Sequence, residues 1–212
     1  MSEFDDEEYE SFELDGASKS AASASGRAGA DDEFDDEIDD DEDFDEVDLE
    51  DAADDEIDFV LAAYREDGQP YVQALAKDLA NDFDELIIQL RRLPGDAGAL
   101  GFVSLVEEVF VLVRVRGQHV QVLLSDGDAA ADWPIARDVA DYLGEEIPDE
   151  DDDDDGEPMG DLGMLADLGL SEFDLTAIID DLDLSSDQML IEVADKLKLN
   201  PQFRKVAESV FN

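Results

Sequence analysis

The sequence predicts an α+β protein: a mostly antiparallel five-stranded sheet in the order ββαβββα with helices on one face, then a small C-terminal all-helical module. Three observations support this class. Residues 100–126 are rich in β-branched side chains, which favour strands. Residues 81–95 carry apolar side chains at helical spacing. Strongly acidic stretches precede the sheet region and separate it from the last helices.

Charge divides the chain into parts. The 212 residues have a formal net charge of −50, of which residues 1–58 carry −26 and residues 146–158 carry −9. So few apolar groups cannot compact segments of this charge density. We therefore expect four parts: a disordered acidic tail (1–56), an α+β sheet domain (57–145), an acidic linker (146–158) and a C-terminal helical module (159–212).

The sheet region opens with a hairpin and a helix. The segment "IDFVLAAYREDGQPYVQALAK" predicts strand, turn and strand, with Asp67-Gly68 as a strong hairpin signal in a loop longer than two residues. The next segment, "NDFDELIIQLRRLPG", predicts a helix. Asp82 and Glu85 form a capping-box-like start, and Pro94 ends the helix.

Three strands follow, at 101–106, 109–116 and 119–125. In the middle strand, valines alternate with Phe110, Leu112, Arg114 and Arg116. We expect the valine face to pack against helices, and the other face to lead out to solvent at its arginine end.

Trp133, the single tryptophan, lies just ahead of a predicted helix. "DWPIARDVADYLG" places Ile135, Val139 and Leu143 on one stripe, and Gly144 ends the helix. Trp133 is therefore expected where helix and sheet meet. Two roles are open for it: filling the edge of the core, or anchoring a partner, as tryptophans often do at interfaces.

The C-terminal part, residues 159–212, predicts helices throughout. "GDLGMLADLG" predicts a short helix ended by Gly169, and the next two helices each begin with a serine cap. The last helix is expected to begin with Asn200 as cap and Pro201 in its first turn. Such a module is about the smallest that folds alone, so docking on the sheet domain stays open.

Metal and cofactor sites are not expected. "DDDDDGEPMGDL" places Asp151, Asp153 and Asp155 like the start of an EF-hand loop, but Leu162 stands where the bidentate glutamate belongs. No glycine-rich loop leads into a helix as phosphate-binding folds require. The chain has no cysteine, which excludes thiolate ligands and disulfides.

Catalysis is not expected either. The single histidine, His119, lies at a predicted hairpin end, and Ser104 and Ser125 lie on neighbouring strands without a spacing that defines a triad. The basic pairs Arg91/Arg92 and Arg114/Arg116 are interpreted as solvated ends of a helix and of a strand. No signal peptide or transmembrane run is recognised, so we expect a soluble, cytoplasmic protein.

Two segments joined by the acidic linker carry a family resemblance. "LLSD" (123–126), "AAADWPIA" (129–136) and "ADLGL" (166–170) resemble the actinobacterial tRNA adenosine deaminase-associated proteins, over about residues 57–212. The resemblance implies association with a tRNA adenosine deaminase and supplies no catalytic residues. The chain itself is no zinc deaminase, because those enzymes need cysteine and histidine ligands and this chain has no cysteine.

We therefore predict a non-enzymatic accessory protein that binds a protein partner, with tRNA adenosine deaminase as the implied one and no direct contact with nucleic acid or membrane. The alternative is an acidic mimic of nucleic acid that regulates a basic partner surface. The candidate contact residues are Trp133, Arg114, Arg116, Leu168 and Leu170.

Overall fold

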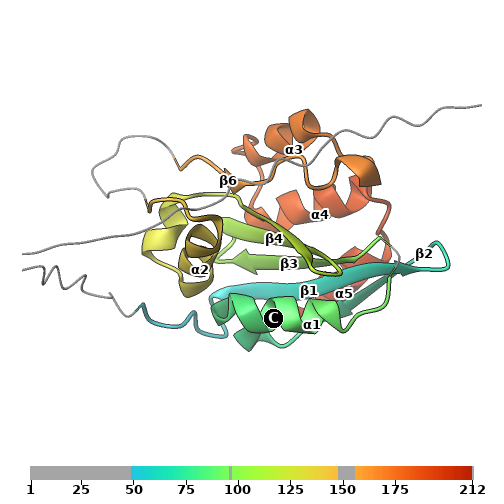
Figure 1. Cartoon of the computed structure of the whole chain (residues 1–212), viewed down its shortest axis with the longest axis horizontal. Coiled ribbons are helices and arrows are strands. Elements are labelled where there is room, and N and C mark those ends of the chain that lie inside the picture. Colours follow the sequence, from blue (N-terminus) through green and yellow to red (C-terminus); the bar gives the residue numbers. More distant parts are fainter. Residues whose placement is uncertain (1–48, 96, 148–155, 212) are drawn as a thin grey trace, which may run out of the picture. The chain divides into compact units, whose positions relative to one another are not determined.

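The computed structural model describes residues 49–95, 97–147 and 156–211. In this part of the chain an antiparallel sheet has the strand order β2-β1-β3-β4-β5-β6 (Figure 1). Its strands are β1 (Ile57–Glu66), β2 (Gln69–Ala74), β3 (Ala99–Leu105), β4 (Val109–Arg116), β5 (His119–Leu124) and β6 (Met159–Gly160). The helices are α1 (Phe83–Arg91), α2 (Pro134–Leu143), α3 (Glu172–Ile179), α4 (Ser186–Lys196) and α5 (Gln202–Val210). Three 3-10 turns are η1 (Lys77–Asn81), η2 (Asp128–Ala131) and η3 (Ala166–Leu168).

The expected five-strand count is wrong by one strand. β6 is only two residues long and pairs with the end of β5, Met159 opposite Leu124 and Gly160 opposite Leu123. Two residues are too few to show a period of two in the sequence. Gly160 also has a φ of +107°, and an added Cβ would lie 2.3 Å from the Val122 carbonyl oxygen, so only glycine fits this close approach.

The first hairpin is tighter than its sequence predicts. Glu66 pairs with Gln69, which leaves Asp67 and Gly68 as a two-residue turn with φ values of 51° and 77°. Positive φ at both positions is typical of the hairpin turn that Asp-Gly favours. Pro70 is tolerated in β2 because β2 is an edge strand of the sheet.

One face of the sheet packs against α1 and α2, as predicted. The four valines of β4 are buried in a core cluster with side chains of these helices, including Leu86, Leu90, Ile135 and Val139. The predicted cap of α1 is confirmed, since the Asp82 carboxylate accepts a 2.8 Å hydrogen bond from the Glu85 N–H. Trp133 stands directly before α2, and Pro134 occupies its first turn.

The C-terminal helices cover the other face, which answers the question that the sequence left open. Figure 1 shows α4 and α1 on opposite sides of β1, β3 and β4. Phe203 of α5 contacts Phe59 and Phe102 edge to face, with ring centroids 5.9 and 4.9 Å apart. The second buried cluster joins sheet residues such as Phe110 to Leu190. The described residues, 49–95, 97–147 and 156–211, accordingly belong to one compact unit.

Some helix ends differ from their expected positions. The predicted helix around "GDLGMLADLG" is a series of turns with the three-residue η3, which ends at Gly169. Ser171 caps α3, as predicted, by accepting a 3.2 Å hydrogen bond from Asp174 N–H. Pro201, rather than the expected Asn200, is the residue before α5, and the Asn200 amide group donates to Asp195 at 3.2 Å.

Two sequence expectations concern residues outside this description. The aspartates of the EF-hand-like stretch, and the tail up to residue 48, lie outside the described residues. The division of the chain into a tail, a sheet domain, a linker and a helical module stays a prediction. Within the described ranges, no helix is long and apolar enough to cross a membrane.

Candidate interaction site

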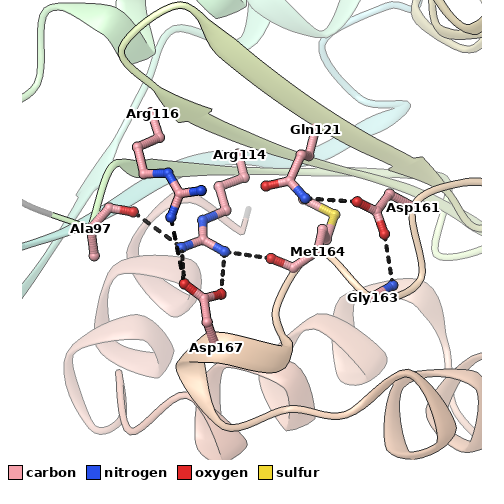
Figure 2. Close-up of polar contacts among 8 residues, drawn as sticks. All are labelled: Ala97, Arg114, Arg116, Gln121, Asp161, Gly163, Met164 and Asp167. Atoms are coloured by element: carbon pink, nitrogen blue, oxygen red, sulfur yellow. Dashed lines mark hydrogen bonds and ion pairs between the residues drawn. The ribbon is translucent and has the colours of Figure 1, made fainter. Parts of the chain in front are cut away.

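Arg114 is buried, which corrects the expectation that the arginine end of β4 faces solvent. Its side chain is 2% exposed. The Nη1 atom donates at 2.5 Å to Asp167 Oδ1 and at 2.5 Å to the Met164 carbonyl, and Nη2 donates at 2.8 Å to Asp167 Oδ2. Nη2 also reaches the Ala97 carbonyl at 3.3 Å (Figure 2). The sequence could not predict this burial, because it depends on a segment fifty residues further along the chain.

The ion pair has a clear electrostatic basis. A buried guanidinium is costly unless it is paired and hydrogen-bonded, and two parallel bonds to one carboxylate are its strongest pairing. Asp167 is 55% exposed, so water reaches the acid side of the pair. The hydrogen bond from Arg114 is the main cause that holds the pKa of Asp167 below its ordinary value, and the nearby charge of Arg116 acts in the same direction.

Arg116 is exposed, as its place at the end of β4 predicts. Its side chain is 51% exposed, and its Nη1 lies 3.7 Å from Asp167 Oδ2. The same carboxylate thus accepts from a buried arginine and stands beside an exposed one (Figure 2). Arg116 keeps most of its hydrogen-bonding capacity available to a partner.

The segment that carries Asp167 is tied to the sheet at several points. After β6, the Asp161 N–H donates to the Val122 carbonyl at 2.9 Å. The Asp161 carboxylate accepts from Gln121 Nε2 at 2.7 Å and from Gly163 N–H at 2.9 Å (Figure 2). These bonds and the Arg114 pair hold residues 159–170 against β4 and β5, and so prepare the start of α3.

The two candidate leucines of this segment have different environments. Leu170 is buried and belongs to the core beneath α3–α5. Leu168 is half-buried and lines, with Arg65 and Leu197, a cavity of about 20 Å³, which is the size of a single water site. Arg65, at the edge of this cavity, donates to the Leu197 carbonyl at 2.5 Å.

Trp133 lies on the other face of the sheet. Its side chain is half-buried and packs against the core beneath α1 and α2, and its backbone N–H donates to the Ala129 carbonyl at 2.9 Å. The five candidate contact residues are therefore not gathered in one patch. Arg114, Leu168 and Leu170 belong to the side covered by the C-terminal helices, and Trp133 to the side covered by α1 and α2.

The histidine and serine candidates do not converge. His119 is exposed at the start of β5, opposite Arg116. Ser104 lies at the other end of the sheet, opposite Phe110. Its buried hydroxyl donates to the Asp58 carboxylate at 2.7 Å and shares a 2.7 Å hydrogen bond with the Ser186 hydroxyl, in which either group can donate. Because these side chains occupy opposite ends of antiparallel strands, they form no triad among the described residues.

An acidic hollow lies between α1 and α2. It has a volume of about 350 Å³ and is lined by Asp82, Phe83, Asp84, Asp138, Asp141 and Tyr142. Partial burial is the main cause that raises the pKa of Asp138, and the neighbouring carboxylates add to it. Among the described residues, no group of three or more His, Cys, Asp or Glu side chains is placed to hold a metal ion.

Sequence reasoning missed two exposed apolar side chains. Phe173 is 81% exposed at the start of α3, and Leu182 is 95% exposed in the turn after it. The signal was present in "SEFDLTAIIDDLDL", where α3 has apolar residues around its whole circumference although it packs with one side only.

Comparisons with known proteins agree with the motifs in this region. The family model described as Rv3753c-like tRNA adenosine deaminase-associated protein matches residues 58–200. The chain is 34% identical over 159 residues to the protein Rv3753c of Mycobacterium tuberculosis, which covers 74% of this chain and 91% of that protein. No solved structure is similar. By the family match and this identity, the chain belongs to the Rv3753c-like tRNA adenosine deaminase-associated protein family.

Proposed function

We propose that this protein is a non-enzymatic cytoplasmic accessory protein that binds a tRNA adenosine deaminase. The observation that carries the proposal is the family match, because it covers both the sheet and most of the helices behind it and is described by association with that enzyme. The composition agrees, since a chain without cysteine lacks the ligands of a zinc deaminase.

The site around Arg114 supports a binding role. The ion pair fixes residues 159–170 on the sheet, so a partner meets a preformed surface and loses little entropy in ordering it. Of the predicted contact residues, Arg116 and Leu168 keep exposed surface at this site, and Trp133 keeps exposed surface on the opposite face of the sheet. Arg114 and Leu170 are buried, and we assign them the role of supporting that surface from below.

The negative charge of the chain favours a basic surface on the proposed partner. A deaminase that grips tRNA must be basic where it does so, and a chain with a net charge of −50 is attracted to such a surface. The acidic-mimic alternative would place the effect in residues 1–56 and 149–155. The family match begins only at residue 58, so it leaves out the acidic segment 1–56 that the alternative requires.

The experiment is co-purification of the tagged chain with the deaminase of the same organism, at low and at moderate salt. A complex at both salt concentrations is the expected result if apolar contacts contribute, and a complex only at low salt indicates charge alone. Absence of a complex in both conditions contradicts the proposal. A variant that lacks residues 1–56 and has residues 149–155 neutralised tests the alternative, which requires that these changes together abolish binding.

A further inference from the structure

The outer side of α3 exposes apolar surface that the fold does not use. Phe173 and Leu182 are 81% and 95% exposed, whereas no other large apolar side chain in the described ranges exceeds 49%. The inner side of the same helix is ordinary, because Leu175 and Ile178 are buried in the core with α4. Side chains as exposed as these contribute little to packing, and large exposed apolar side chains are typical of interaction surfaces.

Carboxylates surround this apolar surface. Five exposed acids flank the two side chains: Glu172, Asp174, Asp180, Asp181 and Asp183. No lysine or arginine occurs between Arg137 and Lys196 to neutralise them. Three of the acids follow the C-terminal end of α3, where the helix dipole is negative and favours cations. In the isolated chain, the exposure of these apolar groups to water and the position of these acids at the negative end of the helix dipole are both energetically unfavourable.

We propose that residues 172–183, which we call the α3 ridge, dock into an apolar groove of a protein partner whose rim carries lysine and arginine. Phe173 in the first turn of α3 and Leu182 in the turn after the helix give the ridge an apolar anchor near each end, and the eight residues of α3 span about 12 Å. The surrounding acids would pair with the basic rim and select against acidic surfaces. This inference rests on the proposed function, because it assumes that the chain acts by binding protein.

The structure behind the α3 ridge holds it in a formed and fixed conformation before any partner binds. Ser171 caps the helix, and the Leu175 and Ile178 side chains fix its rotation on the core. A helix that is already formed loses less conformational entropy on binding than a disordered segment does. The ridge also follows directly after the segment that the Arg114–Asp167 pair holds on the sheet.

The test measures dissociation constants of the full chain for two probes. One is the tRNA adenosine deaminase of the same organism. The other is a synthetic amphipathic helix of leucine and lysine, which supplies the apolar surface bordered by cations that the proposal requires. Phe173→Ala and Leu182→Ala are each expected to weaken binding roughly tenfold or more, as for anchor residues. Ile88→Ala removes a 39% exposed side chain from α1 on the other face and is expected to leave the constant unchanged.

A second pair of variants tests the charges. Asp180→Asn with Asp181→Asn is expected to slow association and to reduce its salt dependence while leaving the unfolding midpoint no lower, because the helix dipole disfavours these acids. Glu145→Gln with Glu146→Gln removes the same charge from an exposed site after α2, and is expected to have a clearly smaller effect.

The outcomes separate the two proposals. If the wild-type chain binds the deaminase and the ridge variants bind it equally well, the ridge inference is overturned and the proposed function stands. If only the peptide binds, and binding depends on Phe173, the ridge stands and the proposed partner is wrong. Failure of the wild-type chain to bind either probe overturns both.

Discussion

Arg114 of β4 and Asp167 of the segment after β6 form a two-point ion pair across fifty-three residues of sequence, with hydrogen bonds of 2.5 and 2.8 Å. One partner is buried and the other is half exposed. The pair fastens residues 159–170 to the sheet, and α3 follows immediately after them. The ion pair therefore helps to fix the position of α3 relative to the sheet.

Asp167→Ala tests how much this ion pair contributes to the stability of the fold. Removal of the carboxylate leaves a buried guanidinium without its charge partner, and a fully buried pair broken in this way costs about 3–5 kcal/mol. Water reaches Asp167, so we expect a loss of about 1–3 kcal/mol in the free energy of unfolding by urea. Arg116→Ala is the matched control. Its half-exposed contact at 3.7 Å should be worth less than about 1 kcal/mol, and an equal loss in both variants would contradict the account.

The same pair predicts a pH dependence. Because the pKa of Asp167 is lowered in the folded state, the pair's stabilisation is present above the ordinary value of 3.8 and is lost as the pH falls through the lowered value. The stability difference between the wild type and Asp167→Asn should be constant from about pH 7 to about pH 5 and shrink below about pH 4. Urea titrations across this range measure it. A difference that grows toward acid pH would show that the pair is not the cause.

Asp138 is expected to behave in the opposite way. Its raised pKa disfavours the charged carboxylate in the folded state, so this contribution to stability is lost as the pH rises through the raised value. Asp138→Asn keeps an oxygen acceptor for the Phe83 N–H, which lies 3.4 Å from the carboxylate. Since solvent screens this partly exposed group, we expect a Tm increase of roughly 1–2 °C at pH 7 and none at about pH 3. Glu145→Gln, the control, should change Tm less at pH 7.

Gly160 tests the close approach of β6 to β5. An alanine there would place Cβ 2.3 Å from the Val122 carbonyl oxygen as well as adopt a positive φ. Gly117→Ala is the matched control, because its φ is also positive but nothing lies within 4 Å, and it should cost about 1 kcal/mol. Gly160→Ala should cost more, and should speed hydrogen exchange of the Asp161 amide, which donates to Val122. Equal losses of stability in the two variants would mean that β6 can move away from β5 to make room for the added Cβ.

Periodic features of this chain were predictable from its sequence, and contacts between distant segments were not. The valine face of β4 and the cap at Asp82 depend on residues that are neighbours in the chain. The burial of Arg114 depends on Asp167, and a two-residue strand such as β6 has no period to detect. Sequence patterns alone also could not show which side of α3 faces outward, so Phe173 was missed as a candidate contact.

The central claim is that the chain binds a tRNA adenosine deaminase as an accessory protein. The most direct measurement is light scattering after size exclusion of the two purified proteins, alone and mixed, at low and at moderate salt. The account predicts a mixed peak whose mass equals a sum of both chains, and that persists in part at moderate salt because apolar contacts are insensitive to screening. Two unchanged peaks with the separate masses, at both salt concentrations, would contradict it.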